Sequence, residues 1–143
     1  MSPFVIMQRL LTSTNIKTWL KDDHNFMGVY PINKLPALHS SSSFNKPLKI
    51  VINLDCSNLP GSHWIALFRT TDGLGEVFDS FGLFPPARVQ LWCNRYCTRW
   101  KHNTLAIQPL DSTLCSFYVC SFLTSRSKFK SMAECVKYVS KIV

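Results

Sequence analysis

Hydrophobic positions along this chain change their spacing several times, and each change marks a predicted element. A helix is predicted from Ser13 or Thr14 to Leu20, where either hydroxyl could cap its start. The segment Phe26–Pro31 is predicted to be extended. Serines 40–43, between flanking prolines, predict a loop inside the domain.

Three closely spaced strands are predicted in the middle of the chain, over residues 48–55, 63–70 and 75–80. Apolar residues occupy both faces of the second strand, which predicts a central strand covered on both sides. The alternation places Ile65 and Leu67 on one face and Trp64, Ala66 and Phe68 on the other. Thr71-Asp72-Gly73 followed by Gly75 is a hairpin sequence, so the second and third strands are expected to be antiparallel.

After Pro85-Pro86 the spacing becomes helical. The apolar positions of this predicted helix are Val89, Trp92, Cys93, Tyr96 and Trp100. A fourth strand is predicted over residues 104–108, a buried helix over 115–123, and an amphipathic helix over 131–143 with Lys137 and Lys141 outward. Strands flanked by helices, without regular alternation, predict an α+β fold with a central mixed sheet, and residues 1–143 are expected to form one domain.

Composition narrows the class of protein. With 46% hydrophobic and 13% aromatic residues, the chain is expected to form a compact domain. No apolar run approaches the roughly 18 residues of a membrane span, and the N-terminus lacks signal-peptide features, so we expect a soluble intracellular protein without membrane contact. Six cysteines could form three disulfides in a secreted protein, but the intracellular expectation favours free, mostly buried thiols.

A net charge of +8 favours anionic partners, nucleic acid first. A basic set could either follow a phosphate backbone or form a solvated face. Its members are Arg88, Arg95, Arg99, Lys101, Arg126, Lys128 and Lys130. Cys93-x3-Cys97 followed by His102 could supply zinc ligands, although two cysteines at this spacing on an apolar helix face are more typical of a core. No metal or cofactor is therefore expected.

Four residues in a fixed order carry the candidate chemistry: His63, Asp79, Gln108 and Cys115. A base, an orienting acid, an oxyanion donor and a thiol nucleophile are what cysteine-based acyl transfer requires. Cys115 is expected in the first turn of a helix capped by Asp111, Ser112 or Thr113, where the helix N-terminus favours the thiolate.

Each of the four residues also has an ordinary structural explanation. Cys115 could be a core cysteine and His63 a surface histidine beside a turn. Asp79 could simply end a strand, and Gln108 could be a solvent-exposed side chain stiffened by Pro109. The predicted hairpin brings His63 and Asp79 toward one another, but their pairing depends on the strand register.

The four residues and their surroundings resemble adenovirus-type cysteine endopeptidases (adenain) and, more distantly, proteases that process ubiquitin-like modifiers. The resemblance covers roughly residues 13 to 125. Its matching pieces are Asn25-Phe26-Met27-Gly28-Val29-Tyr30, Gly61-Ser62-His63-Trp64, Val77-Phe78-Asp79-Ser80-Phe81-Gly82 and the seven-residue step from Gln108 to Cys115. Papain-like proteases have the order Cys, His, Asn instead.

The resemblance implies a papain-like α+β fold in circularly permuted chain order, with His63 as general base, Asp79 as orienting acid, Gln108 as oxyanion donor and Cys115 as nucleophile. Trp64 is expected to pack against the site. The family further implies a monomer that cleaves virion precursor proteins after small residues such as glycine. It works in the host nucleus and the virion, with DNA or a viral peptide as activator.

Three departures qualify what the resemblance implies. Asp79 stands where adenain usually has Glu, whereas Asp is normal in the modifier-processing branch. Ser116 follows the nucleophile where glycine is usual. The sequence also ends soon after the nucleophile helix, so no peptide-binding cysteine is carried over. Two alternatives therefore stay open: a protease that removes ubiquitin-like modifiers, and an inactive basic DNA-binding module.

Overall fold

The computed structural model describes residues 12–39, 46–55, 63–109 and 112–143. Its centre is a five-stranded mixed sheet in the order β1-β2-β3-β4-β5. The strands are β1 (Phe26–Pro31), β2 (Leu48–Asn53), β3 (Trp64–Arg69), β4 (Leu74–Phe78) and β5 (Arg99–His102). The two outer pairs are parallel, and β3 is antiparallel to both β2 and β4. The predicted α+β class and mixed sheet are confirmed.

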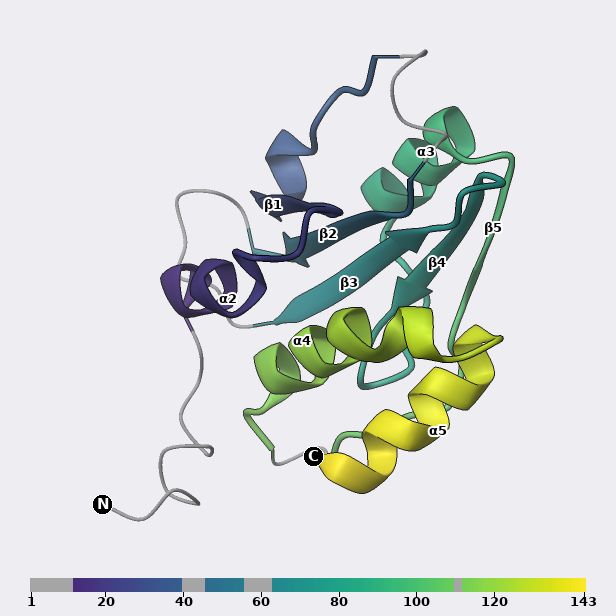
Figure 1. Cartoon of the computed structure of the whole chain (residues 1–143). Coiled ribbons are helices and arrows are strands. Elements are labelled where there is room, and N and C mark those ends of the chain that lie inside the picture. The colour runs from purple at the N-terminus through teal and green to yellow at the C-terminus, as the bar shows by residue number, and fades with distance from the viewer. Residues whose placement is uncertain (1–11, 40–45, 56–62, 110–111) are drawn as a thin grey trace.

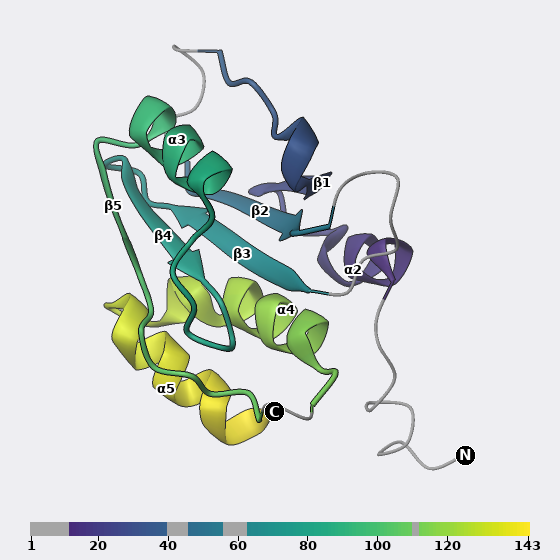
Figure 2. The same cartoon turned by 180° about the vertical axis from the view of Figure 1, so that it is seen from behind.

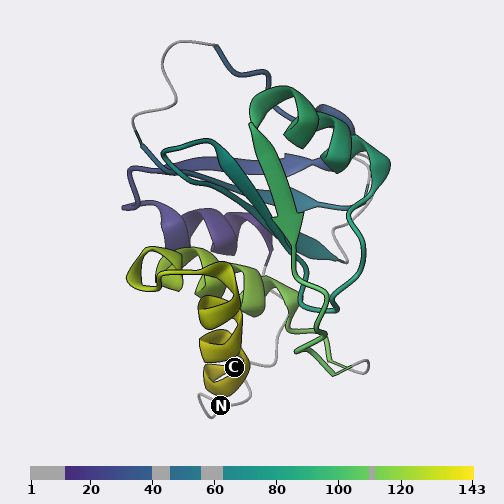
Figure 3. The ribbon, with the colours of Figure 1, turned by 90° about the vertical axis from the view of Figure 1, so that its right-hand side faces the viewer.

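Helices cover both faces of the sheet (Figures 1 and 2). One face carries α2 (Ser13–Leu20) and α4 (Cys115–Ser125), with α5 (Met132–Ile142) packed beyond α4. The other carries α3 (Ala87–Tyr96) and the short 3-10 helix η1 (Ile32–Lys34). The side view in Figure 3 displays these layers. A second 3-10 turn, η2 (Arg126–Lys128), links α4 to α5.

The central strand β3 is buried along its whole length, as its two apolar faces predict. Trp64, Ala66 and Phe68 pack in the core under α4, whereas Ile65 and Leu67 pack in the core under α3. The alternation of side chains in a strand thus divides one apolar run between two cores. Gly73, with φ of 90°, forms the predicted turn into β4.

Two sequence predictions need correction. Helix α3 ends at Tyr96 because Cys97 is extended, so Trp100 belongs to β5 and its indole Nε1 donates to Asn94 Oδ1. The predicted strand over residues 104–108 is wrong; the strand lies at Arg99–His102, and the later segment is irregular. Both errors arise because aromatic spacing cannot distinguish a helix that continues from a strand that follows.

Helix caps also differ from prediction. Thr12 caps α2 in a reciprocal capping box with Asn15, in place of Ser13 or Thr14. Leu114, without a side-chain cap, precedes α4, while Ser112 Oγ accepts from the Leu114 N–H; Asp111 lies outside the described residues, as does the loop at serines 40–43. Helix α5 matches its prediction, with Lys137 and Lys141 exposed.

Candidate active site

The β3–β4 hairpin brings His63 and Asp79 together. In its register Ala66 pairs with Phe78 and Leu67 with Val77, so continuing the same pairing places His63 opposite Phe81 and diagonal to Asp79. The contact between the His63 and Phe81 rings, with centroids 5.1 Å apart, agrees with that continuation. The register left open by the sequence therefore puts both polar side chains on one face.

His63 Nε2 and Asp79 Oδ1 lie 3.0 Å apart in a hydrogen bond that is largely shielded from water. Asp79 Oδ1 also accepts the Phe81 backbone N–H at 2.8 Å, which fixes the carboxylate toward the ring. With Nε2–H donating to Asp79, the neutral imidazole keeps its lone pair on Nδ1. The acid therefore selects the ring nitrogen that is left to exchange protons.

Cys115 is the first residue of α4 and only 2% exposed. Burial lowers the pKa of His63, but hydrogen bonding with Asp79 and Cys115 and the negative charge of both raise it to about 9. Nδ1 is buried and makes no hydrogen bond of standard geometry with the described residues, whereas the Cys115 thiol acts on the ring electrostatically. Such pairs tighten when substrate binds.

Gln108 is held in place by Ser80, which the sequence analysis did not single out. The N–H groups of Ile107 and Gln108 donate to Ser80 O at 2.8 and 3.0 Å. The Ser80 hydroxyl donates to Gln108 Oε1, and Gln108 Nε2 donates to Ser112 O at 2.9 Å. Gln108 is 4% exposed, so the alternative of a solvent-exposed glutamine is wrong. Within the part of the chain that the structure describes, no acceptor takes the second amide hydrogen, so a ligand could accept it.

Asn103 is the second residue missed from the sequence. Its Oδ1 accepts the Asp79 N–H at 2.8 Å and its Nδ2 donates to Asp79 O at 2.6 Å, so one amide satisfies both backbone groups of the acid. A lone asparagine after a strand carries no recognisable signal. Its role follows only from the crossing of residues 103–108 beside the end of β4.

Gly82 permits that crossing. Its φ is 69°, and a Cβ at this position would lie 2.8 Å from Thr104 O and 2.9 Å from Ala106 N. A side chain here would push the 104–106 segment away. The glycine therefore permits the turn after Asp79 and also the close approach of the segment that leads to Gln108.

Trp64 is buried in the core beside α4, with no hydrogen-bond partner for its indole N–H among the described residues. Ser116, after the thiol, is fully buried. Trp64 shares a core with Cys115, and the Phe81 ring packs against His63. Helix α4 presents the sulfur at its N-terminus, where backbone N–H groups can stabilise negative charge.

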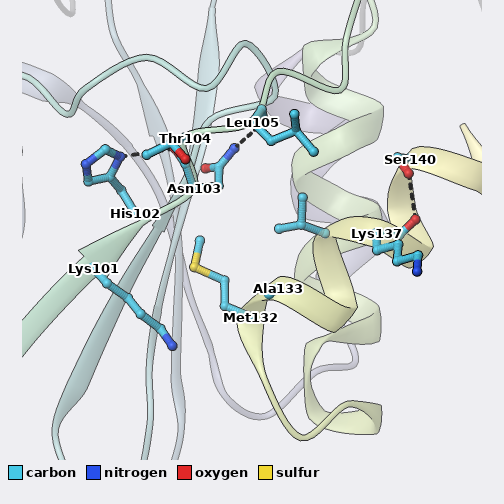
Figure 4. Close-up of a pocket in the computed structure, with 10 residues that line it drawn as sticks. Lys101, His102, Asn103, Thr104, Leu105, Met132, Ala133, Lys137 and Ser140 are labelled. Carbon is cyan, nitrogen blue, oxygen red and sulfur yellow. Dashed lines mark hydrogen bonds between the residues drawn. The ribbon is translucent and has the colours of Figure 1, made fainter.

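A separate cavity of about 520 Å³ lies between β5 and α5. Figure 4 places Met132 and Leu105 at its apolar part, with the Asn103 side chain donating to Leu105 O beside it. Neither Cys115 nor His63 lines this cavity. Asn103, which binds the backbone of Asp79, lines this cavity, whereas the reactive side chains of His63 and Cys115 do not.

The other chemical alternatives can be placed as well. Within the described part of the chain, no three His, Cys, Asp or Glu side chains gather where they could hold a metal ion. Arg126 does not belong to an exposed basic face, because it is 6% exposed and paired with Glu76. The remaining basic residues of that set are exposed. No helix in the described residues is long and apolar enough to span a bilayer.

Structural comparison places this geometry in a known fold. A scan against protein-family models found no match, and neither did a search of curated proteins. The structure is similar to a selenomethionine crystal structure of the ASFV pS273R protease, with a TM-score of 0.66 and 18% identity over 98% of this chain and 68% of that chain. The fold is shared.

A second crystal structure of the ASFV pS273R protease gives a TM-score of 0.62 and 19% identity over 98% of this chain and 67% of that one. The central domain of the Lpg1148 protein from Legionella pneumophila gives a TM-score of 0.54 and 12% identity, over 93% of this chain and 87% of that one. At these identities the comparisons establish the α+β architecture and not the activity.

Proposed function

We propose that this protein is a viral or virus-like-element cysteine endopeptidase in which Cys115 is the nucleophile. The observation that carries the proposal is the buried His63–Asp79 hydrogen bond at 3.0 Å, with the Cys115 thiol acting on the same ring. The fold shared with the ASFV pS273R protease, at a TM-score of 0.66, supports it. We further propose that the arrangement corresponds to the permuted papain-like order of adenain-type enzymes.

The proposed reaction begins with attack of the Cys115 thiolate on the substrate carbonyl carbon. The developing oxyanion receives hydrogen bonds from the second N–H of Gln108 Nε2 and from the Cys115 backbone N–H. His63 Nδ1–H then protonates the leaving amine, and the C–N bond breaks. Water, deprotonated by His63, hydrolyses the thioester and returns the thiol.

Asp79 holds the imidazole in the orientation that this sequence needs. Its hydrogen bond keeps a proton on Nε2 and leaves Nδ1 to exchange protons with sulfur and amine. The raised pKa of His63, about 9, favours the imidazolium that must donate to the leaving group near neutral pH. The Asn103 side chain holds the backbone of Asp79, and the Phe81 N–H holds its carboxylate.

We propose virion precursor proteins as substrates, cleaved after small residues such as glycine, in the nucleus of an infected cell and in the virion, with DNA or a viral peptide as activator. A ubiquitin-like-modifier protease is the second candidate, favoured by an aspartate as the acid behind His63. A substrate peptide must widen the access to Cys115, which is 2% exposed.

The decisive experiment combines a panel of glycine-containing peptides with a ubiquitin-like protein that carries an electrophilic C-terminus. The panel should be cleaved by the wild-type chain and not by Cys115→Ala. Cys120→Ala is the matched control, because that thiol lies on the same helix, is fully buried and has its pKa raised to about 12 by burial. Cleavage by Cys115→Ala at the wild-type rate would overturn the assignment.

Labelling of Cys115 by the electrophilic modifier without peptide cleavage would favour the second candidate. If neither reaction occurs and the chain instead binds DNA with a steep salt dependence, the protein is a nucleic-acid-binding module. Adding duplex DNA or virion peptides to the cleavage assay tests the proposed activation. A sedimentation measurement tests the expected monomer.

A further inference from the structure

A second group of thiols lies at the opposite end of the sheet from Cys115. Cys93 occupies the last turns of α3 and Cys97 is its C-cap, with the Cys97 N–H donating to Cys93 O at 2.8 Å. Cys93 is fully buried, whereas Cys97 is partly accessible. The two side chains are hydrogen-bonded to each other.

Cys97 lies beside a buried cation, Arg69, and beside a glycine, Gly75, that leaves room for its sulfur. Arg69, at the end of β3, is 1% exposed, donates to Tyr96 O at 3.1 Å and interacts electrostatically with Cys97. On the neighbouring strand β4, Gly75 makes room for the sulfur: a Cβ there would lie 2.7 Å from Cys97 Sγ. A buried guanidinium beside a partly accessible sulfur favours the thiolate.

The electrostatics separate the two thiols. The hydrogen bond from Cys93 lowers the pKa of Cys97, and the Arg69 charge adds to this against the effect of burial. The same hydrogen bond, together with burial, raises the pKa of Cys93. The pair therefore contains one thiol prepared to react first and one adjacent thiol that remains protonated.

We propose that Cys97 and Cys93 form a peroxide-sensitive redox pair, with Cys97 as the reacting thiol and Cys93 as the resolving thiol. The Cys97 thiolate attacks a peroxide oxygen, the O–O bond breaks, and the leaving oxygen takes up a proton as water or alcohol. Cys93 then attacks the sulfur of the Cys97 sulfenic acid. The S–S bond forms, the S–O bond breaks and water leaves.

This inference does not rest on the proposed protease activity. The pair lies where β4 begins, at Gly75, whereas His63 and Asp79 lie where β3 begins and β4 ends. The disulfide would join the end of α3 to the residue that leads into β5. Oxidation of the pair is therefore expected to leave the His63–Asp79 hydrogen bond intact, and it can be tested in a chain that lacks Cys115.

The test uses the folded Cys115→Ala chain, treated with hydrogen peroxide, then denatured, alkylated and digested with trypsin. Cleavage after Arg88, Arg95 and Arg99 places Cys93 and Cys97 in separate peptides, 89–95 and 96–99. The disulfide should appear as these two peptides joined, with a mass lower by two hydrogens. Cys120 and Cys135, with pKa values raised by burial to about 12 and 11, are internal controls and should remain alkylatable.

Variants assign the two roles. In Cys93→Ser, a Cys97 sulfenic acid should persist and be trapped by dimedone, whereas in Cys97→Ser the buried Cys93 should resist oxidation. Arg69→Met should slow the oxidation of Cys97 severalfold, while Arg88→Met, which removes an exposed arginine from α3 and keeps the cleavage site at Arg95, should not. Oxidation of Cys97 no faster than that of Cys135, or its over-oxidation without the joined peptides, would overturn the proposal.

Discussion

Two carboxylates three residues apart, one inside β4 and one just past its end, perform different physical tasks. Glu76, inside β4, is fully buried and uses both oxygens on Arg126, at 2.6 and 2.9 Å. Asp79, one residue past β4, uses one oxygen on His63 and on the Phe81 N–H. The first partner is a permanent cation, and the second can lose its proton, with a pKa that is raised to about 9.

The difference shows how position along a strand separates stability from chemistry. Glu76 points to the face of α4, where Arg126 also stacks 5.1 Å from the Phe68 ring, and the pair is almost completely shielded from water. Asp79 lies where the strand opens into a turn, so its partner can reach both the carboxylate and the thiol. The interior pair holds the layers together, and the pair at the strand end can exchange protons.

The largest expected effect is a loss of activity, and it is expected for Asp79 and not for Glu76. Asp79→Asn should lower kcat/KM by about 10³- to 10⁴-fold, because the amide no longer favours the required tautomer and imidazolium. The free energy of unfolding should change far less. Peptide cleavage and denaturant unfolding measured on the same sample check this, and full activity in Asp79→Asn would remove the acid from the mechanism.

The reverse result is expected for the interior pair. Arg126→Met should lower the free energy of unfolding by about 3–5 kcal/mol, because it leaves Glu76 buried without its cation. The activity of the molecules that remain folded should be unchanged. The double variant Glu76→Met with Arg126→Met is the control: it should recover most of the stability, and a double variant as unstable as the single one would contradict this explanation.

A smaller effect is expected at Gln108. Gln108→Ala should reduce kcat by about 10²-fold through loss of an oxyanion donor, with little change in KM. Ser80→Ala is the matched control, because it removes the hydroxyl that positions Oε1 but keeps the amide donor. Steady-state kinetics check the order of the three proteins. If Ser80→Ala lowers kcat more than Gln108→Ala does, Gln108 acts through packing and not as an oxyanion donor.

The smallest effect is a shift in pH dependence. The folded-state pKa of His63 is raised to about 9, so its pairing with Asp79 stabilises the fold fully below the unfolded pKa of about 6.5 and loses that contribution as pH rises through 9. Activity that needs the imidazolium should fall over the upper part of this range. Asp79→Asn should move the fall to lower pH. A pH profile that does not move would show that Asp79 does not raise the pKa of His63.

Sequence reasoning succeeded where one local pattern determined the structure. The two apolar faces of β3, the Thr71-Asp72-Gly73 turn and the amphipathic α5 were all predicted. It failed where neighbouring residues fit two structures equally well, as with Trp100, whose spacing fits the helix although it lies in β5. Arg126 was assigned to a basic face because sequence cannot reveal a partner fifty residues away.

The sequence by itself determined the candidate residues His63, Asp79, Gln108 and Cys115, because residue types and their order along the chain limit which chemistry is available. Only the tertiary structure decided the register that joins His63 to Asp79 and the placement of Asn103 and Ser80 behind the acid and the amide. The physical reason is that these contacts link separate segments. Their hydrogen bonds exist only after the sheet has aligned the ends of its strands.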